Sequence, residues 1–132
     1  MNQVRTVAKA IERFSRKAVK AMTICELAKE LDLSVLTDKN YDDREIKGCF
    51  VGDLLSWVMS RAEQDSAWIT IMNNINIVAV AALVDMACII LAEGVDVTED
   101  VIKKAESQGI IILSTKKTCY ETAVAFHKAT GI

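Results

Sequence analysis

Polar side chains suited to binding a small molecule follow four short apolar runs of the sequence, at the point where each run ends. Amide and hydroxyl groups recognise polar ligands through hydrogen bonds, and the N-terminus of a helix can bind an anion such as phosphate. The ten candidate ligand-binding residues are Gly52, Asp53, Thr70, Asn73, Asn74, Asn76, Glu93, Ser114, Thr115 and Thr118, and Gly94 and Lys116 stand beside them in the sequence.

Helix capping offers a simpler explanation for part of this set. Asp53, Asn73, Asn74 and Thr118 each stand where the N-cap of a following helix is expected. Capping alone explains any one of them, so the argument for a ligand site rests on their coincidence at one edge of the predicted fold.

Groups for catalysis are fewer. Asp53 and Glu93 are the candidates for a carboxylate pair that acts as general acid and base. The one histidine, His127, stands four residues before Gly131, where we expect it to interact with the C-terminus of a helix. The chain contains no phosphate-binding G-x-x-x-x-G-K-[ST] loop, no G-x-G-x-x-G and no G-x-S-x-G motif. We therefore predict that the protein is not an enzyme.

The four cysteines predict reduced thiols. Cys25, Cys49, Cys88 and Cys119 lie far apart and form no C-x-x-C pair. No secretory signal precedes them, so we expect a cytoplasmic protein in which most of the four act as small buried hydrophobic residues. A metal site would need further ligands, and none is predicted. The sequence identifies no cofactor.

Strand and helix signals alternate from residue 49 onward. Apolar β-rich runs predict strands at 49–51, 68–71, 88–91 and 110–113, and helices are expected at 54–63, 75–86, 98–109 and 118–128. Strands separated by single helices imply right-handed crossovers and a parallel sheet. The predicted fold is a three-layer α/β/α domain with a mainly parallel sheet of at least four strands, whose carboxyl edge gathers the polar residues above.

The apolar stretch 68–92 decides between a membrane anchor and a core. Its part 75–92 alone has about the 18–20 residues that a bilayer requires. However, Asn73, Asn74 and Asn76 interrupt the stretch, and the Asp85 carboxylate would be costly in mid-bilayer. We interpret the stretch as strand, loop, helix and strand, with a helix that is buried or lies at a subunit contact.

Charge divides the chain into two parts. Residues 1–21 contain six Lys or Arg and one Glu, a net charge of +5, whereas residues 22–132 carry a net charge of −7. We expect 1–21 to be a basic amphipathic helical extension and 22–132 to be the α/β domain. The extension packs on the domain or its twin, lies on an anionic membrane surface, or precedes a self-contained unit that begins at Met22. The acidic domain disfavours nucleic-acid binding.

A short helix begins the domain. Thr23 and Glu26 form a T-x-x-E capping box, which predicts a helix through Leu31. Acidic residues follow it where a recognition helix would need to contact DNA, which argues against a helix-turn-helix.

A second subunit would explain the composition. The apolar share of 52% is high for a free monomer of 132 residues, although a deeply buried parallel sheet is the alternative. On the helix expected at 54–63, Leu54, Leu55 and Val58 supply the inward stripe, which leaves Trp57, and with it Met59, toward a neighbouring surface. We predict a homodimer, with Trp57 at a subunit or partner contact and a second core layer as the alternative.

Several segments together resemble the DRTGG-domain family, in particular its small stand-alone bacterial and archaeal members. The likeness covers Met22 to Phe126, and its VGDLLS and NIVAVA segments are fairly specific in combination. The chain lacks the Asp-Arg-Thr-Gly-Gly run that names the family, and the corresponding loop lies around 73–76. The segments are Gly48-Cys49-Phe50-Val51-Gly52-Asp53-Leu54-Leu55-Ser56, Trp68-Ile69-Thr70-Ile71, Asn76-Ile77-Val78-Ala79-Val80-Ala81 and Ile112-Leu113-Ser114-Thr115.

The resemblance implies a regulatory or ligand-sensing module that often dimerises and has no established chemistry. Related domains occur beside CBS pairs and in the N-terminal part of some phosphotransacetylases, and the fold resembles the N-terminal domain of HPr kinase. Taken with the residues, it predicts a non-catalytic module that binds a small polar or nucleotide-like ligand at the carboxyl edge of the sheet. The alternatives are an interaction scaffold without a ligand and a small enzyme acting on a phosphorylated metabolite.

Overall fold

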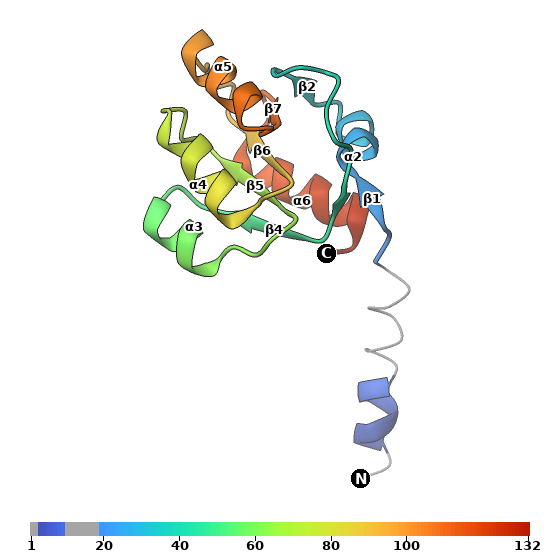
Figure 1. Ribbon diagram of the computed structural model, residues 1–132. Helices are drawn as coiled ribbons and strands as arrows, with labels where there is room; N and C mark the ends of the chain where they lie inside the picture. Colours follow the sequence, from blue (N-terminus) through green and yellow to red (C-terminus); the bar gives the residue numbers. More distant parts are fainter. Residues whose placement is uncertain (1–2, 10–18) are drawn as a thin grey trace.

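A mainly parallel sheet forms the centre of the molecule (Figure 1). The computed structural model describes residues 3–9 and 19–132, and in this part of the chain five strands form one sheet in the order β2-β7-β6-β5-β4. Strands β4 (Gly48–Val51), β5 (Ser66–Thr70), β6 (Cys88–Leu91) and β7 (Ile112–Ser114) are parallel. The edge strand β2 (Ser34–Val35) pairs antiparallel with β7.

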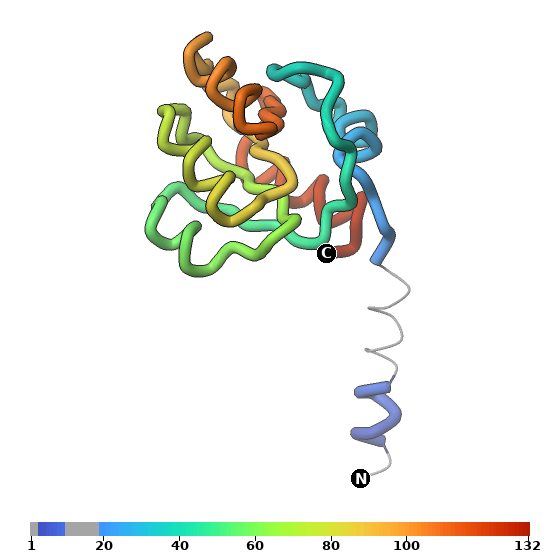
Figure 2. Tube along the Cα trace, viewed as in Figure 1, coloured from blue at the N-terminus to red at the C-terminus, as the bar shows by residue number. Residues whose placement is uncertain are grey.

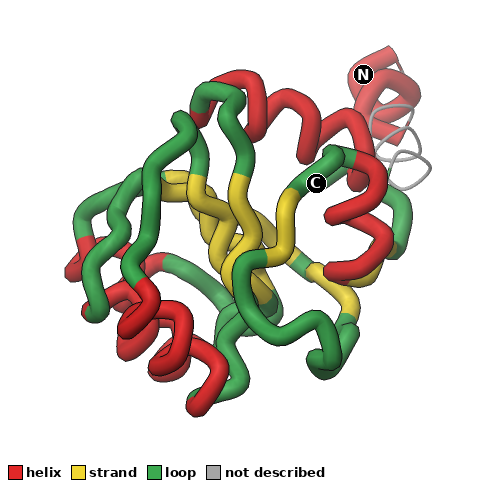
Figure 3. The backbone as a smooth tube through the Cα atoms, turned by 90° about the horizontal axis from the view of Figure 1, so that it is seen from above, coloured by secondary structure: helices red, strands yellow, loops and turns green. Residues whose placement is uncertain are grey.

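Helices cover both faces of this sheet. Helices α3 (Leu55–Arg61), α4 (Asn76–Val84) and α5 (Glu99–Ser107) connect successive parallel strands and lie side by side on one face. Helices α2 (Ile24–Glu30) and α6 (Cys119–Thr130) pack together on the other face. Figure 3 shows the strands between these two groups of helices. The predicted three-layer α/β/α fold is confirmed.

The central strands separate two hydrophobic cores. Every residue of β5 and β6 is buried, and successive side chains point to opposite faces. Ile69 and Ile90 pack in the core that contains Phe126 of α6. Trp68 and Ile89 pack in the other core with α3, α4 and α5. Strands buried on both faces explain the continuous apolar runs of the sequence.

A cluster of charges fastens the amino edge of the sheet. Arg44 contacts Asp65 at 3.1 Å and Asp85 at 2.9 Å, and it also donates to the Met86 carbonyl. Asp65 and Asp85 stand just before β5 and β6, each in the left-handed backbone region. The Arg44 and Gln64 side chains hold the pKa of Asp85 below its usual value. This network joins the loops opposite the carboxyl edge.

Element boundaries differ slightly from the sequence predictions. Strand β5 begins at Ser66, because Ser66 and Ala67 pair with the first residues of β4. Helix α4 ends at Val84, because Asp85 adopts a left-handed conformation with φ of 60°. Strand β2 and the small antiparallel pair β1 (Met22–Thr23) and β3 (Glu45–Ile46) were not predicted, since two-residue strands leave almost no periodic signal.

The two ends of the folded part lie together. The Lys20 amide donates to the Thr130 carbonyl at 2.7 Å, and Figure 2 shows the chain near residue 20 beside the C-terminal helix. Residues 3–9 are helical and all exposed, with Val4 and Val7 uncovered. The rest of the predicted basic extension, residues 1–2 and 10–18, lies outside the described residues. No helix in the described ranges is both long and apolar enough to cross a membrane.

Candidate functional site

The chain leaves β6 and β7 toward opposite faces of the sheet. The loop after β6 leads to α5 on one face, whereas the loop after β7 leads to α6 on the other. Loops that diverge in this way open a crevice at the carboxyl ends of neighbouring strands, where α/β proteins commonly bind ligands. A pocket of about 520 Å³ lies there, lined by residues 94–97 and 114–117, Ile102 of α5, and Leu31, Asp32, Ser34 and Leu36.

The pocket combines an apolar interior with a charged rim. Its apolar side is made by the buried Leu31 and the half-buried residues Leu36, Val95, Val97 and Ile102. Four of the other lining residues are charged and exposed, and within the described ranges no ion pair joins any two of them. They are Asp32, Asp96, Lys116 and Lys117.

Backbone hydrogen bonds hold the two loops of the crevice together. The Glu93 amide donates to the Lys117 carbonyl at 2.8 Å, and the Gly94 amide donates to the Thr115 carbonyl at 3.0 Å. Glu93 and Gly94 both adopt left-handed backbone conformations, with φ of 62° and 68°. A side chain at position 94 would also meet Lys116, whose Cγ lies 3.8 Å from the place of a Cβ atom. The pocket wall is therefore fixed by the backbone.

Of the ten predicted site residues, Ser114 and Thr115 line the pocket. Both are half-buried, and the Thr115 hydroxyl accepts a hydrogen bond from the Lys117 amide at 3.2 Å. Gly94 and Lys116, which belong to the same predicted edge, also line it.

Gly52, Asp53 and Thr70 instead fasten the ends of β4 and β5. The prediction that Asp53 caps α3 is wrong, because the N-cap residue is Leu54 and it makes no side-chain cap bond. The Asp53 carboxylate accepts from the buried Thr70 hydroxyl at 2.7 Å and from the Ile71 amide at 3.0 Å. The Gly52 carbonyl accepts from the Trp68 indole at 2.9 Å.

The three asparagines belong to the loop before α4. Asn74 Oδ1 accepts from the Asn76 amide at 2.9 Å and thereby shapes the turn into the helix, although the N-cap residue itself is Ile75. Asn73 Nδ2 donates to the Asp96 carbonyl at 2.6 Å. Because Asp96 lines the pocket, Asn73 supports the pocket wall from the neighbouring loop.

Glu93 and Thr118 satisfy the N-terminus of α6. Glu93 Oε2 accepts from the Cys119 amide at 2.7 Å. Thr118 and Glu121 form a capping box, which confirms Thr118 as a cap and lowers the pKa of Glu121 through its bonds to Thr118. Because these groups bind the amides of Cys119 and Glu121, and Glu93 brings a negative charge beside them, the start of α6 disfavours an anion.

The Cys119 thiol lies near both candidate catalytic carboxylates. Burial raises its pKa, and the negative charges of Glu93 and Asp53 raise it further. Each of these carboxylates already accepts a backbone amide bond, so both have a structural role. At the far end of α6, His127 Nδ1 lies 2.8 Å from the Ile132 carbonyl oxygen.

No metal-binding cluster of three or more His, Cys, Asp or Glu side chains forms among the described residues. All four cysteines are free. Burial raises the pKa of Cys49 and of Cys88 to about 12, which keeps both thiols protonated and unreactive.

Sequence reasoning missed one side of the pocket. Leu31, Asp32, Ser34 and Leu36 come from the segment around β2, which was not predicted as a strand. The alternation of apolar and polar residues over 33–35 was the only signal, and it is too short to identify a strand. The β6–α5 side contributes Val95, Asp96, Val97 and Ile102, and the β7–α6 side contributes Lys117, none of which was predicted.

Comparison with known proteins assigns the chain to a domain family. The sequence profile of the DRTGG domain matches residues 26–129. A crystal structure of the CBS and DRTGG domains of the regulatory region of Clostridium perfringens pyrophosphatase, complexed with the activator diadenosine tetraphosphate, has a similar fold, with a TM-score of 0.67 and 11% identity. The similarity covers 88% of this chain, which spans about half (49%) of that structure's chain. Comparison with curated proteins gave no match.

Proposed function

We propose that this chain, which belongs to the DRTGG domain family, is a non-catalytic regulatory module that binds a small polar or nucleotide-like ligand in the pocket at the carboxyl edge of its sheet. The pocket between the diverging β6 and β7 loops is the observation that carries this proposal. Its volume lies within the range of about 300–1,000 Å³ that is usual for small-molecule sites.

Two further observations support a regulatory role. The Asp53 and Glu93 carboxylates, the candidates for acid–base chemistry, accept structural hydrogen bonds, which favours binding over catalysis. The similar Clostridium perfringens structure is a regulatory region in complex with a nucleotide activator, and we extend that class of role to this chain. The free cysteines agree with a cytoplasmic location.

We further propose that the module acts as a homodimer. Helix α4 contains no charged residue, and its outer side exposes Leu83 at 72%. Ile75 before α4 and Trp57 on the adjacent α3 are 46% and 50% exposed. The exposure of Trp57 argues against its second-core-layer alternative. Exposed apolar residues that gather over two neighbouring helices are typical of a protein contact.

A thermal-shift screen tests the ligand proposal. The full chain is heated with nucleotides, phosphorylated metabolites, amino acids and common coenzymes, because a ligand at about 100 times its Kd adds roughly 2.7 kcal/mol to stability. Ser34→Trp fills the pocket from β2 and should abolish the shift. Ser56→Trp, at an exposed position of α3 outside the pocket, should retain it.

The alternatives give different results. An interaction scaffold, which the exposed apolar residues on α3 and α4 favour, shows no ligand shift but retains its contact with a protein. Turnover of a phosphorylated compound that is lost in Asp53→Asn would identify the small enzyme instead and would contradict the proposed function.

A further inference from the structure

We infer that the pocket binds a nucleoside monophosphate, a ligand with a single phosphate, in preference to a nucleotide with a longer polyphosphate chain. This inference rests on the proposed function, since it concerns the chemistry of the same pocket. It starts from the juxtaposition of two adjacent lysines, two aspartates and an apolar wall around one crevice.

The lysines provide the anion site. Lys116 and Lys117 follow Thr115 in the loop after β7, line the pocket and form no ion pair with another described residue. Gly94 lies against Lys116 without a side chain, which leaves space on that side. Two lysine ammonium groups match the charge of about −2 that a terminal phosphate monoester carries at neutral pH.

The helix N-termini at this edge do not add to the anion site. Glu93 and the Thr118 capping box occupy the start of α6. The first turn of α5 contains Glu99 and Asp100, whose negative charges oppose an anion there. The phosphate must therefore depend on the two lysines.

The aspartates limit the length of the phosphate chain. Asp32 and Asp96 line the same pocket, so the four charged side chains sum to zero. A tri- or tetraphosphate would bring further negative charges near these carboxylates, which repel them. The carboxylates are instead suited to accept hydrogen bonds from ribose hydroxyls or a base amino group.

The apolar wall provides the place for the base. Leu36, Val95, Val97 and Ile102 form a half-buried surface from β2, the β6–α5 loop and α5. A planar base that packs on aliphatic side chains removes apolar surface from water, whereas inorganic phosphate gains nothing from this wall. The wall thus predicts that a nucleoside monophosphate binds more tightly than phosphate alone.

Isothermal titration of the full chain tests the inference. The ligands are the four common ribonucleoside monophosphates, their nucleosides and triphosphates, inorganic phosphate and diadenosine tetraphosphate. We expect at least one monophosphate to bind more tightly than its nucleoside, its polyphosphates and inorganic phosphate. Lys116→Ala with Lys117→Ala should weaken that binding at least ~10-fold, since charge-assisted bonds are lost.

Matched variants separate charge from fold. Lys103→Ala with Lys104→Ala removes the same charge from α5, and these residues lie outside the pocket, so its affinity should stay within about twofold. Asp32→Asn with Asp96→Asn should raise the affinity for ATP relative to the monophosphate. Circular dichroism checks that every variant is folded.

The outcomes distinguish this inference from the function on which it rests. Tighter binding of a polyphosphate, or equal binding of inorganic phosphate, overturns the monophosphate inference and leaves the sheet-edge ligand site intact. A non-nucleotide ligand whose binding is lost in Ser34→Trp also overturns the monophosphate inference and leaves the sheet-edge ligand site intact. If no compound of either panel binds, both the inference and the ligand-sensing function fail.

Discussion

The Asp53 carboxylate fixes the end of β5 through two acceptor bonds, to the buried Thr70 hydroxyl and to the Ile71 amide. Thr70 has no exposed surface, so its hydroxyl depends on this partner. Thr70 Oγ1 in turn accepts from the Met72 amide at 3.1 Å. One exposed carboxylate thereby holds the first part of the loop that leads to α4.

Removal of this carboxylate should destabilise the fold. Asp53→Ala leaves the Thr70 hydroxyl without its acceptor, and we expect the free energy of unfolding to fall by about 1–3 kcal/mol. Asp53→Asn retains an acceptor oxygen, so its free energy of unfolding should fall by less. Urea denaturation measures both; equal stability of the alanine variant and the parent would show that these bonds contribute nothing.

The buried thiols predict a loss of stability at alkaline pH. Burial raises the pKa of Cys49 and Cys88 to about 12, whereas the unfolded thiols ionise near their ordinary value of 9.0. The native state therefore keeps protons that the unfolded state releases, so this stabilisation is complete below pH 9.0 and is lost as pH rises toward 12.

Denaturation of the parent and of Cys49→Ala with Cys88→Ala, compared at about pH 8 and about pH 10, measures this effect. The double variant should be less stable at the lower pH because of its cavities, but its stability should fall less between the two. Identical falls would contradict the proposed role of the thiols.

At the scale of the element, helices α5 and α6 differ in how they begin. Thr118 caps α6 by accepting from the Glu121 amide at 3.0 Å. Thr98 occupies the same position of α5, but its side chain makes no cap bond to the backbone. The two threonines thus form a matched pair for measuring the capping interaction.

Thr118→Ala should lower the free energy of unfolding by about 1 kcal/mol, because it removes one acceptor of the capping box. Thr98→Ala should lower the free energy of unfolding by clearly less, because Thr98 makes no cap bond. Chemical denaturation of both variants tests this, and equal losses would mean that the cap bond itself has no measurable value.

Local patterns predicted elements well and long-range partners poorly. The Thr118 capping box spans three residues, so the sequence displays both partners, and the structure confirms it. Asp53 was expected to cap α3, yet its partner Thr70 lies 17 residues away on the neighbouring strand. The pairing of β4 with β5 brings Asp53 to Thr70, and a local sequence pattern does not show which strands pair.

The same reason limited the prediction of the site. The carboxyl edge and Ser114 and Thr115 followed from the alternation of strands and helices. The opposite wall, from Leu31 to Leu36, is brought there by the antiparallel pairing of β2 with β7, between Ser34 and Ser114. A two-residue strand carries no sequence signal that identifies a pairing partner 80 positions further along the chain.

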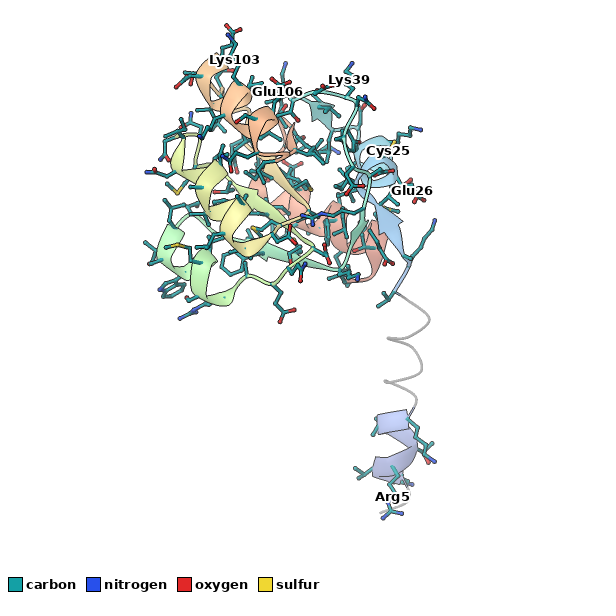
Figure 4. All side chains as sticks on the ribbon, in the orientation of Figure 1. Arg5, Cys25, Glu26, Lys39, Lys103 and Glu106 are labelled. Carbon is teal, nitrogen blue, oxygen red and sulfur yellow. The ribbon has the colours of Figure 1, made fainter. Side chains whose placement is uncertain are left out.

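At the scale of the molecule, the three helices of one face differ in their outer surfaces. Lys103 and Glu106 project outward from α5 (Figure 4), and Lys103 pairs with Glu99 at 3.4 Å. Helix α4 exposes Leu83 without any charged neighbour of its own. The Arg61 guanidinium covers the exposed Trp57 ring at 3.7 Å from its centroid. We therefore expect α4 to lie at the centre of the proposed subunit contact.

Leu83→Glu should convert the proposed dimer to a monomer without unfolding it, because Leu83 is 72% exposed. Light scattering after size-exclusion chromatography measures the mass. Lys103→Glu on α5 is the control and should leave the mass unchanged. A parent chain that is monomeric at all concentrations would refute the dimer, and an unchanged dimer in Leu83→Glu would exclude this face.

The bond between the Lys20 amide and the Thr130 carbonyl means that the first and last residues of the folded domain lie side by side. A host protein could carry such a unit as a cassette inserted into one of its loops, with little change in the distance between the loop's ends. The same proximity makes the unit suitable for circular permutation: a short Gly-Ser linker from residue 132 back to residue 20, with new ends in an exposed loop, should preserve the fold.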